Sequence, residues 1–343
     1  MTSTDRLIRT GFIAGFAALA LAACDRQPEA LELEGSAFGT RYQVILVDPG
    51  GDPGLETGPL AGAIEDTLES LDRTFSTWRA DSEISRINRA EAGIDLLLSD
   101  DFQQVLAEAR SVHRLSGGAL DVALLPLAEA WGFQALSVTT PPSDEALARL
   151  KRITGMQRLA FGEDGSSLRK RDARQGLDLS ALAKGYAVDR LGDLLREAGA
   201  NDFLVAFGGE ILARGERPGG GPWRIAIEPP AEGLPSIPLL LSDAAVATSG
   251  DYRNFVEIDG DRLGHVLDPA TGRPSVNGAV SATVIAASTQ RADALATAFL
   301  VLDEASAFEL AATLGVGLRR VVRHGDGFAS RENAAFRAHV ATP

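Results

Sequence analysis

The strongest structural constraint in this chain is an amphipathic helical pattern that starts near residue 178. Its apolar positions recur every four residues, at Leu179, Ala183, Ala187 and Leu191. This spacing places their side chains on one face of an α-helix. Asp178 precedes the pattern, and an aspartate at a helix start accepts a hydrogen bond from a free backbone N–H group. The pattern therefore predicts a helix that is capped at Asp178 and buried along one side.

Two residues inside this helix, Lys184 and Gly185, call for an explanation. A glycine within a helix costs about 1 kcal/mol relative to alanine, so a close neighbour at Gly185 would account for it. A lysine in the first turns opposes the helix dipole but is well placed to meet a bound anion. Taken alone, the stretch favours a solvated lysine beside a packing glycine. A binding role for Lys184 depends on the rest of the chain.

The first 23 residues have the form of a secretory signal. Arg6 and Arg9 precede an apolar run over residues 11–22, which is short for a membrane span. Cys24 follows a Leu-Ala-Ala sequence and is the only cysteine in the chain. No intramolecular disulfide is therefore possible.

The position of Cys24 resembles the lipobox of bacterial lipoproteins, in which the cysteine is lipidated and becomes the mature N-terminus. We therefore expect a signal peptide over residues 1–23, a lipid anchor at Cys24 and a polar tether over residues 24–34. Asp25 indicates retention at the inner membrane, with the protein facing the periplasm. An ordinary secreted protein with an incidental cysteine is the alternative.

The overall charge restricts the classes of partner. The 343 residues carry a formal net charge of −14, which argues against binding to nucleic acid through its phosphates. A local basic or metal-bearing pocket can still hold a phosphate ligand. The chain is long enough for one large domain or two medium ones.

Helical and strand patterns are interspersed along the chain, and many connections have the form of hairpins. This favours an α+β architecture over a regular doubly wound sheet. We expect helices over residues 64–75, 102–116, 144–152, 180–195 and 291–302. We expect strands over residues 38–47, 203–207, 211–214, 223–227, 238–241, 280–286 and 316–323.

One helix carries a candidate metal site. Asp293 and Thr297 are four residues apart, so both side chains project from the same helix face. A carboxylate and a hydroxyl, with backbone carbonyls nearby, form the oxygen-only set that suits Mg²⁺. Without other signals, a capping aspartate with a packed threonine behind it is the favoured explanation of the pair.

Three further residues could carry chemistry. His265 follows a predicted hairpin and has a side chain whose unperturbed pKa suits a general base, although an ordinary histidine at a strand end fits equally well. Trp78 is either the rim of a core or a stacking platform for a planar ligand. Asp121, after a Gly-Gly turn, is either a cap or a ligand contact. The sequence contains no Walker-type loop, GxGxxG motif, zinc-ligand spacing or GxSxG motif.

Together, these stretches resemble the FAD:protein FMN transferase family of the ApbE type. The motifs run in family order from about residue 35 to residue 302. They comprise Phe38-Gly39-Thr40, residues 76–88, Ala119-Leu120-Asp121, residues 178–189, Phe207-Gly208-Gly209-Glu210, residues 248–253, residues 265–272 and residues 292–297. Arg291 departs from the family pattern, in which threonine is frequent at this position.

The resemblance implies a two-part body of mixed and antiparallel sheets with flanking helices, and a ligand cleft between the parts. This transferase domain would cover residues 35–330, followed by a tail over residues 331–343. FAD would be a substrate, contacted by Phe38, Trp78, Ala119, Leu120, Asp121, Asp178, Lys184 and Leu267. Mg²⁺ would be held by Asp293, by Thr297 and by the backbone oxygen of Ala181.

The reaction implied by the resemblance is the transfer of FMN to a threonine or serine hydroxyl of a client flavoprotein. The hydroxyl attacks the FMN-side phosphorus of FAD and AMP leaves. We expect His265 to accept the hydroxyl proton, with Asp251 or Asp268 as competing candidates. The client would be a subunit of a membrane redox complex or a periplasmic flavoprotein. A flavin-storage lipoprotein and a Mg²⁺-dependent FAD pyrophosphatase are the alternatives.

Overall fold

A central antiparallel sheet organises the computed structural model, which describes residues 30–47, 57–133, 140–231, 234–251, 255–258, 261–325 and 327–341. The sheet has eight strands in the order β1-β2-β6-β7-β10-β15-β16-β17. The strands are β1 (Ala30–Ala37), β2 (Thr40–Val47), β6 (Phe203–Phe207), β7 (Glu210–Arg214), β10 (Ala244–Gly250), β15 (Ala279–Ala286), β16 (Gly317–His324) and β17 (Gly327–Glu332). Together with the helices, this sheet confirms the predicted α+β class.

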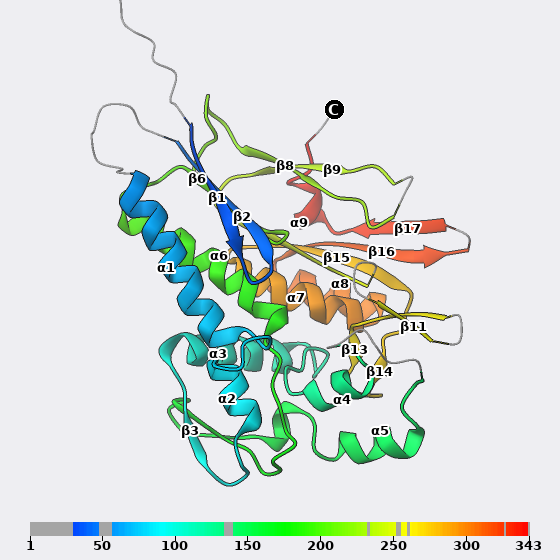
Figure 1. Cartoon of the computed structure of the whole chain (residues 1–343). Coiled ribbons are helices and arrows are strands. Elements are labelled where there is room, and N and C mark those ends of the chain that lie inside the picture. Colours follow the sequence, from blue (N-terminus) through cyan, green and yellow to red (C-terminus); the bar gives the residue numbers. More distant parts are fainter. Residues whose placement is uncertain are drawn as a thin grey trace, which may run out of the picture.

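Helices cover one face of the sheet, below it in Figure 1. They are α1 (Thr57–Phe75), α3 (Asp100–Leu115), α6 (Ser180–Glu197), α7 (Thr289–Val301) and α8 (Glu304–Leu314). The strands meet them with alternate side chains, such as Val44 and Leu46 of β2, which are buried in the main core. Alternation of this kind is expected for a sheet that packs on one face against helices.

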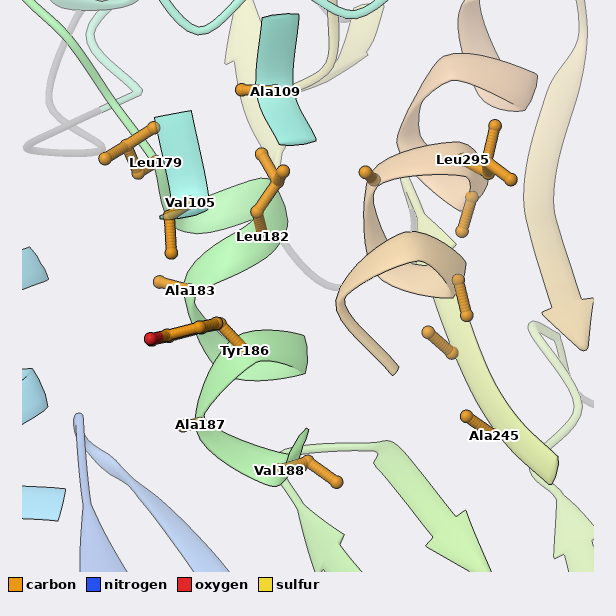
Figure 2. Close-up of a cluster of buried hydrophobic side chains, with 14 of the residues drawn as sticks. Val105, Ala109, Leu179, Leu182, Ala183, Tyr186, Ala187, Val188, Ala245 and Leu295 are labelled. Carbon is orange, nitrogen blue, oxygen red and sulfur yellow. The ribbon is translucent and has the colours of Figure 1, made fainter. Parts of the chain in front are cut away.

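Helix α6 lies at the centre of this core. Its predicted apolar face is buried, and Figure 2 shows α6 between Val105 and Ala109 of α3 and Leu295 of α7. Leu182 and Val188 are also fully buried, because α7 covers a second side of the helix. The helix begins at Ser180 with Leu179 as its N-cap residue. The N-cap is therefore one residue later than the predicted cap, Asp178. The Asp178 carboxylate nevertheless accepts the Ser180 N–H at 2.9 Å.

A two-stranded hairpin covers part of the opposite face of the sheet, above it in Figure 1. Strands β8 (Trp223–Ile227) and β9 (Ile237–Leu241) pack Trp223 and Leu239 against Leu204 and Val246 of the sheet. Helix α9 (Ala334–Arg337) adds the fully buried Phe336 to this second core.

The second part of the molecule, in the lower half of Figure 1, is built from short elements. They are α2 (Glu83–Arg89), β3 (Asp95–Leu97), α4 (Leu125–Ala130), α5 (Asp144–Lys151), η1 (Met156–Arg158), β4 (Ala160–Phe161), β5 (Ser167–Arg169) and the hairpins β11 (Phe255–Ile258)–β12 (Asp261–Gly264) and β13 (Leu267–Asp268)–β14 (Arg273–Pro274). Leu127, Trp131, Leu147 and Leu267 form a small core of their own here.

Several predicted boundaries were wrong. Residues 30–34, expected in a tether, belong to β1, and the strand expected over residues 38–47 starts at Thr40. Phe38 and Gly39 form the intervening turn, with φ angles of 49° and 73°. The strand expected to be the last is followed by β17 and α9, so residues 331–337 are structured and do not form a tail.

The predicted signal peptide and Cys24 lie outside the described residues. The turn of the hairpin expected before His265, at residues 259 and 260, also lies outside them. In the described part of the chain, none of the helices combines the length and apolar character needed to cross a bilayer.

Candidate functional site

Lys184, in the second turn of α6, lies against a buried carboxylate to which the sequence analysis gave no role. The Lys184 Nζ atom is 2.5 Å from Oε1 of Glu210. The Glu210 side chain is only 3% exposed. The sequence signal was a glutamate at the start of a strand, but its partner is 26 positions away and is identified only by the fold.

A Gly-Gly turn between β6 and β7 makes this contact possible. Gly208 has a φ of 65°, in the left-handed region that favours glycine. A Cβ atom on Gly208 would lie 3.2 Å from Cδ of Lys184 and 3.3 Å from Oε2 of Glu210. The turn thus packs its backbone directly onto the ion pair.

Asp293 of α7 joins the same cluster. Its Oδ2 atom is 4.0 Å from Nζ of Lys184 and accepts the Gly185 N–H at 3.1 Å. Burial raises the pKa of Asp293 to about 7; nearby Lys184 opposes this rise and Glu210 adds to it. The carboxylate is therefore poorly stabilised by the protein alone, and an added cation would favour its charged form.

Gly185 has the close neighbour that its position in a helix predicted. A Cβ atom there would lie 2.6 Å from the carbonyl oxygen of Thr289, at the start of α7. Asp189, one turn later on α6, accepts the backbone N–H groups of Thr289 and Gln290 at 2.8 and 2.9 Å. The two helices are therefore in backbone contact, which places Asp293 against α6.

Thr297 and Ala181 complete the predicted oxygen set. The Thr297 hydroxyl is hydrogen-bonded to the Ser249 hydroxyl at 3.0 Å, at the end of β10. In a regular helix the Ala181 carbonyl would accept the N–H of Gly185, which here also donates to Asp293.

These residues fit a hard divalent cation such as Mg²⁺, because all their donors are oxygens and one is a buried carboxylate. Oε2 of Glu210 adds a buried oxygen that has no hydrogen-bond partner among the described residues. No group of three or more His, Cys, Asp or Glu side chains suited to a metal occurs in the described part of the chain. A site here would thus depend on a hydroxyl and a backbone carbonyl as well as a carboxylate.

Two aromatic residues predicted to contact flavin differ in exposure. Trp78, between α1 and α2, is 82% exposed, so it is not the rim of a core. Phe38 lies in the β1–β2 turn, and its ring meets Phe207 edge-on at 5.6 Å between centroids. An exposed indole suits the stacking of a planar ligand.

A cavity of about 670 Å³ contains another group of predicted residues. Ala119, Asp121 and Asp268 line it together with His113. The Asp121 carboxylate accepts the N–H groups of Ala123 and Met156 and lies 3.7 Å from Nδ1 of His113. Burial raises the pKa of Asp121. Its predicted role as a cap of loop amides is therefore present, and its side chain also faces a cavity.

The remaining predicted contacts differ in their surroundings. Leu120 and Leu267 have buried side chains, in the main core and the small core respectively. Asp178 donates its N–H to the carbonyl of Val122 at 2.8 Å, which ties the start of α6 to the Asp121 segment. Arg291, which departs from the family pattern, pairs with Glu108 of α3 at 2.8 Å.

The structure places the backbone next to His265 against Asp251. A Cβ atom on Gly264 would lie 2.5 Å from Cβ of Asp251, so the residue before His265 lies directly against Asp251. The Asp251 carboxylate also meets Arg323 at 3.5 Å. Asp268 instead accepts the Ala270 N–H within its own turn at 2.9 Å. His265 follows Gly264 directly and is half-buried.

These features define an α+β protein with an oxygen-rich lysine–aspartate site between two helices at one end of its sheet. The sequence model of the ApbE family matches residues 38–319. The chain belongs to the ApbE family.

Named relatives are similar over nearly their whole length. The chain is 36% identical to the FAD:protein FMN transferase of Vibrio cholerae, over 96% of this chain and 98% of that one. It is 34% identical to the FAD:protein FMN transferase of Haemophilus influenzae, over 96% of each chain.

Solved structures show the same fold. The flavin transferase ApbE from Vibrio cholerae has a TM-score of 0.82 at 35% identity, covering 91% of this chain and 99% of that one. The apo form of the Pseudomonas stutzeri flavinyl transferase ApbE has a TM-score of 0.83 at 37% identity, covering 92% of this chain and 98% of that one.

Proposed function

We propose that this protein transfers FMN from FAD to a threonine or serine hydroxyl of a client flavoprotein and releases AMP. The observation that carries the proposal is the contact of Lys184 with Asp293, one helical turn from Thr297. It occurs in a chain whose relatives are named FAD:protein FMN transferases. A fixed cation beside hard oxygen donors suits a pyrophosphate substrate.

Each of these side chains has its own proposed role. Lys184 attracts the negative phosphates, while the exposed Trp78 and Phe38 hold the flavin ring. The cavity at Asp121 receives a further part of FAD. His265 accepts the proton of the client hydroxyl as that oxygen attacks the FMN-side phosphorus, and the bond to AMP breaks. Asp251, against the preceding residue, is the competing base.

The same proposal includes Mg²⁺, which Asp293, Thr297 and the carbonyl of Ala181 would hold. A bound Mg²⁺ would neutralise negative charge on the phosphates. The raised pKa of Asp293 supports this assignment, because a buried carboxylate without a full counter-charge favours a cation.

The products formed from FAD distinguish the proposed transfer from two alternatives, flavin storage and FAD hydrolysis. The protein is incubated with FAD, Mg²⁺ and a candidate client, and both AMP and a covalent FMN mass increment on the client are measured. Binding of FAD without AMP would indicate flavin storage. AMP with free FMN and an unlabelled client would indicate an FAD pyrophosphatase.

A variant tests the proposed base. His265→Ala should lower the rate of client labelling by about 10²-fold or more, the contribution typical of a general base, while FAD affinity stays within twofold. The rate is measured by client mass spectrometry and the affinity by flavin fluorescence. Labelling by His265→Ala at a near-normal rate would rule out this role and leave Asp251 as the candidate.

The proposal also places the protein on the periplasmic side of the inner membrane, held by lipid at Cys24. The lipobox-like sequence before Cys24 supports this location. Cys24→Ser should abolish incorporation of a labelled fatty acid in cells; persistent incorporation would contradict the anchor.

A further inference from the structure

A second large cavity lies on the other face of the central sheet, and none of the residues proposed to bind FAD or Mg²⁺ lines it. Its volume is about 760 Å³. The outward-facing residues Gln43, Ala206, Val246 and Thr248 form its floor, and Ile225 of β8 is among its walls. This groove therefore runs between the sheet and the β8–β9 hairpin, on the side opposite α6 and α7.

One end of the groove reaches the proposed catalytic site. Gly208 lines the groove and also packs against Lys184. Thr248 and Gly250 line it as well, while Ser249 between them points the other way and bonds Thr297. Successive strand residues face opposite sides of a sheet. At Ser249, the groove and Thr297 therefore lie on opposite faces of the sheet.

The wall formed by β8 has a backbone edge that faces away from β9. Opposite Arg224, Leu240 donates its N–H to the carbonyl of His339 at 2.7 Å. Opposite Ala226, Pro238 accepts from the N–H of Ala341 at 3.0 Å. The backbone N–H of Leu240 and the carbonyl of Pro238 therefore point away from β8.

In an antiparallel ladder, both residues of such a pair direct their N–H and C=O groups outward. Arg224 and Ala226 consequently present these groups on the edge of β8 away from β9. No strand in the described part of the chain pairs with that edge, and Ala226 is exposed and lines the groove.

We propose that this groove binds an extended segment of the client protein, which pairs with the edge of β8 and brings its acceptor hydroxyl to the Lys184 site. The inference rests on the proposed transfer function. An unused strand edge beside a half-apolar groove is the arrangement by which proteins bind extended peptides. The lining also carries both charge signs, with Arg41, Glu34 and Glu228, which suits a polypeptide better than a flavin.

The route has a consequence for the reaction. In this arrangement FAD would bind on the face of the sheet that α6 and α7 cover, and the client would enter from the opposite face. Donor and acceptor therefore meet at the Gly208–Gly209 turn without competing for one cavity.

Ala226→Pro tests the groove, because proline removes the outward N–H without removing a bond to β9. The probe is the protein substrate of the Vibrio cholerae FAD:protein FMN transferase. We expect the KM for this client to rise about fivefold to tenfold, as for the loss of one backbone hydrogen bond. The kcat and the affinity for FAD should stay within twofold. Ala226→Val keeps the N–H and, as the conservative variant, should keep the wild-type KM.

A second variant covers the case in which Ala226→Pro does not fold. Gln43→Trp fills the floor of the groove from a half-exposed position and should also raise the KM for the client. An unchanged KM in the folded variants would overturn the inference while leaving the proposed function intact. Absence of client labelling by the wild-type protein would instead contradict the proposed function, and this inference with it.

Discussion

At the scale of single residues, Asp293 links pH to both stability and metal binding. Its pKa is about 7 in the folded protein and about 3.9 in an unfolded chain. Folding therefore favours the protonated carboxyl, so its contribution to stability is present below about pH 4 and is lost as the pH rises towards 7. A bound divalent cation would reverse this balance, because it requires the carboxylate.

Asp293→Asn tests this linkage by thermal unfolding. In EDTA, the Tm of the wild type should fall relative to that of Asp293→Asn between about pH 5 and pH 8. Mg²⁺ should raise the wild-type Tm more at about pH 8 than at pH 5, and should leave the variant unchanged. Parallel Tm curves in EDTA, or an equal Mg²⁺ shift in the variant, would contradict the role of Asp293.

At the scale of secondary-structure elements, the contact between α6 and α7 builds the site. Gly185 allows the backbones to touch, and Asp189 holds the first amides of α7. The periodicity of α6 and the glycine within it were readable from the sequence. The Lys184–Glu210 pair was not, since it depends on how β7 packs against α6.

A pair of glycine substitutions isolates this contact. Gly185→Ala should lower the free energy of unfolding by about 1–3 kcal/mol, because the added Cβ atom overlaps a backbone carbonyl. The matched control is Gly62→Ala in α1, where a Cβ atom meets nothing within 4 Å. It should raise the free energy of unfolding by about 0.5–1 kcal/mol. Urea denaturation measures both, and equal effects would refute the proposed cause.

At the scale of the whole molecule, hydrophobic periodicity predicted most central strands and long helices, and hence the α+β class. Strand β1 was missed because its alternating Glu32 and Glu34 were interpreted as a polar tether. They lie on an edge strand, where one face is exposed. The role proposed for the Ala181 carbonyl came from family resemblance, since a backbone oxygen leaves no side-chain signal. The outer groove was also unpredicted, because it depends on how the β8–β9 hairpin lies over the sheet.

The central claim is that FMN passes from FAD to a protein hydroxyl within one reaction. The most direct test is the ratio of AMP released to FMN covalently attached, measured by chromatography and intact-protein mass spectrometry with FAD, Mg²⁺ and the client. We expect one AMP for each FMN on the client, and an unlabelled client when its acceptor threonine or serine is replaced by alanine. AMP accumulating without label on the client, or label unaffected by that replacement, would contradict it.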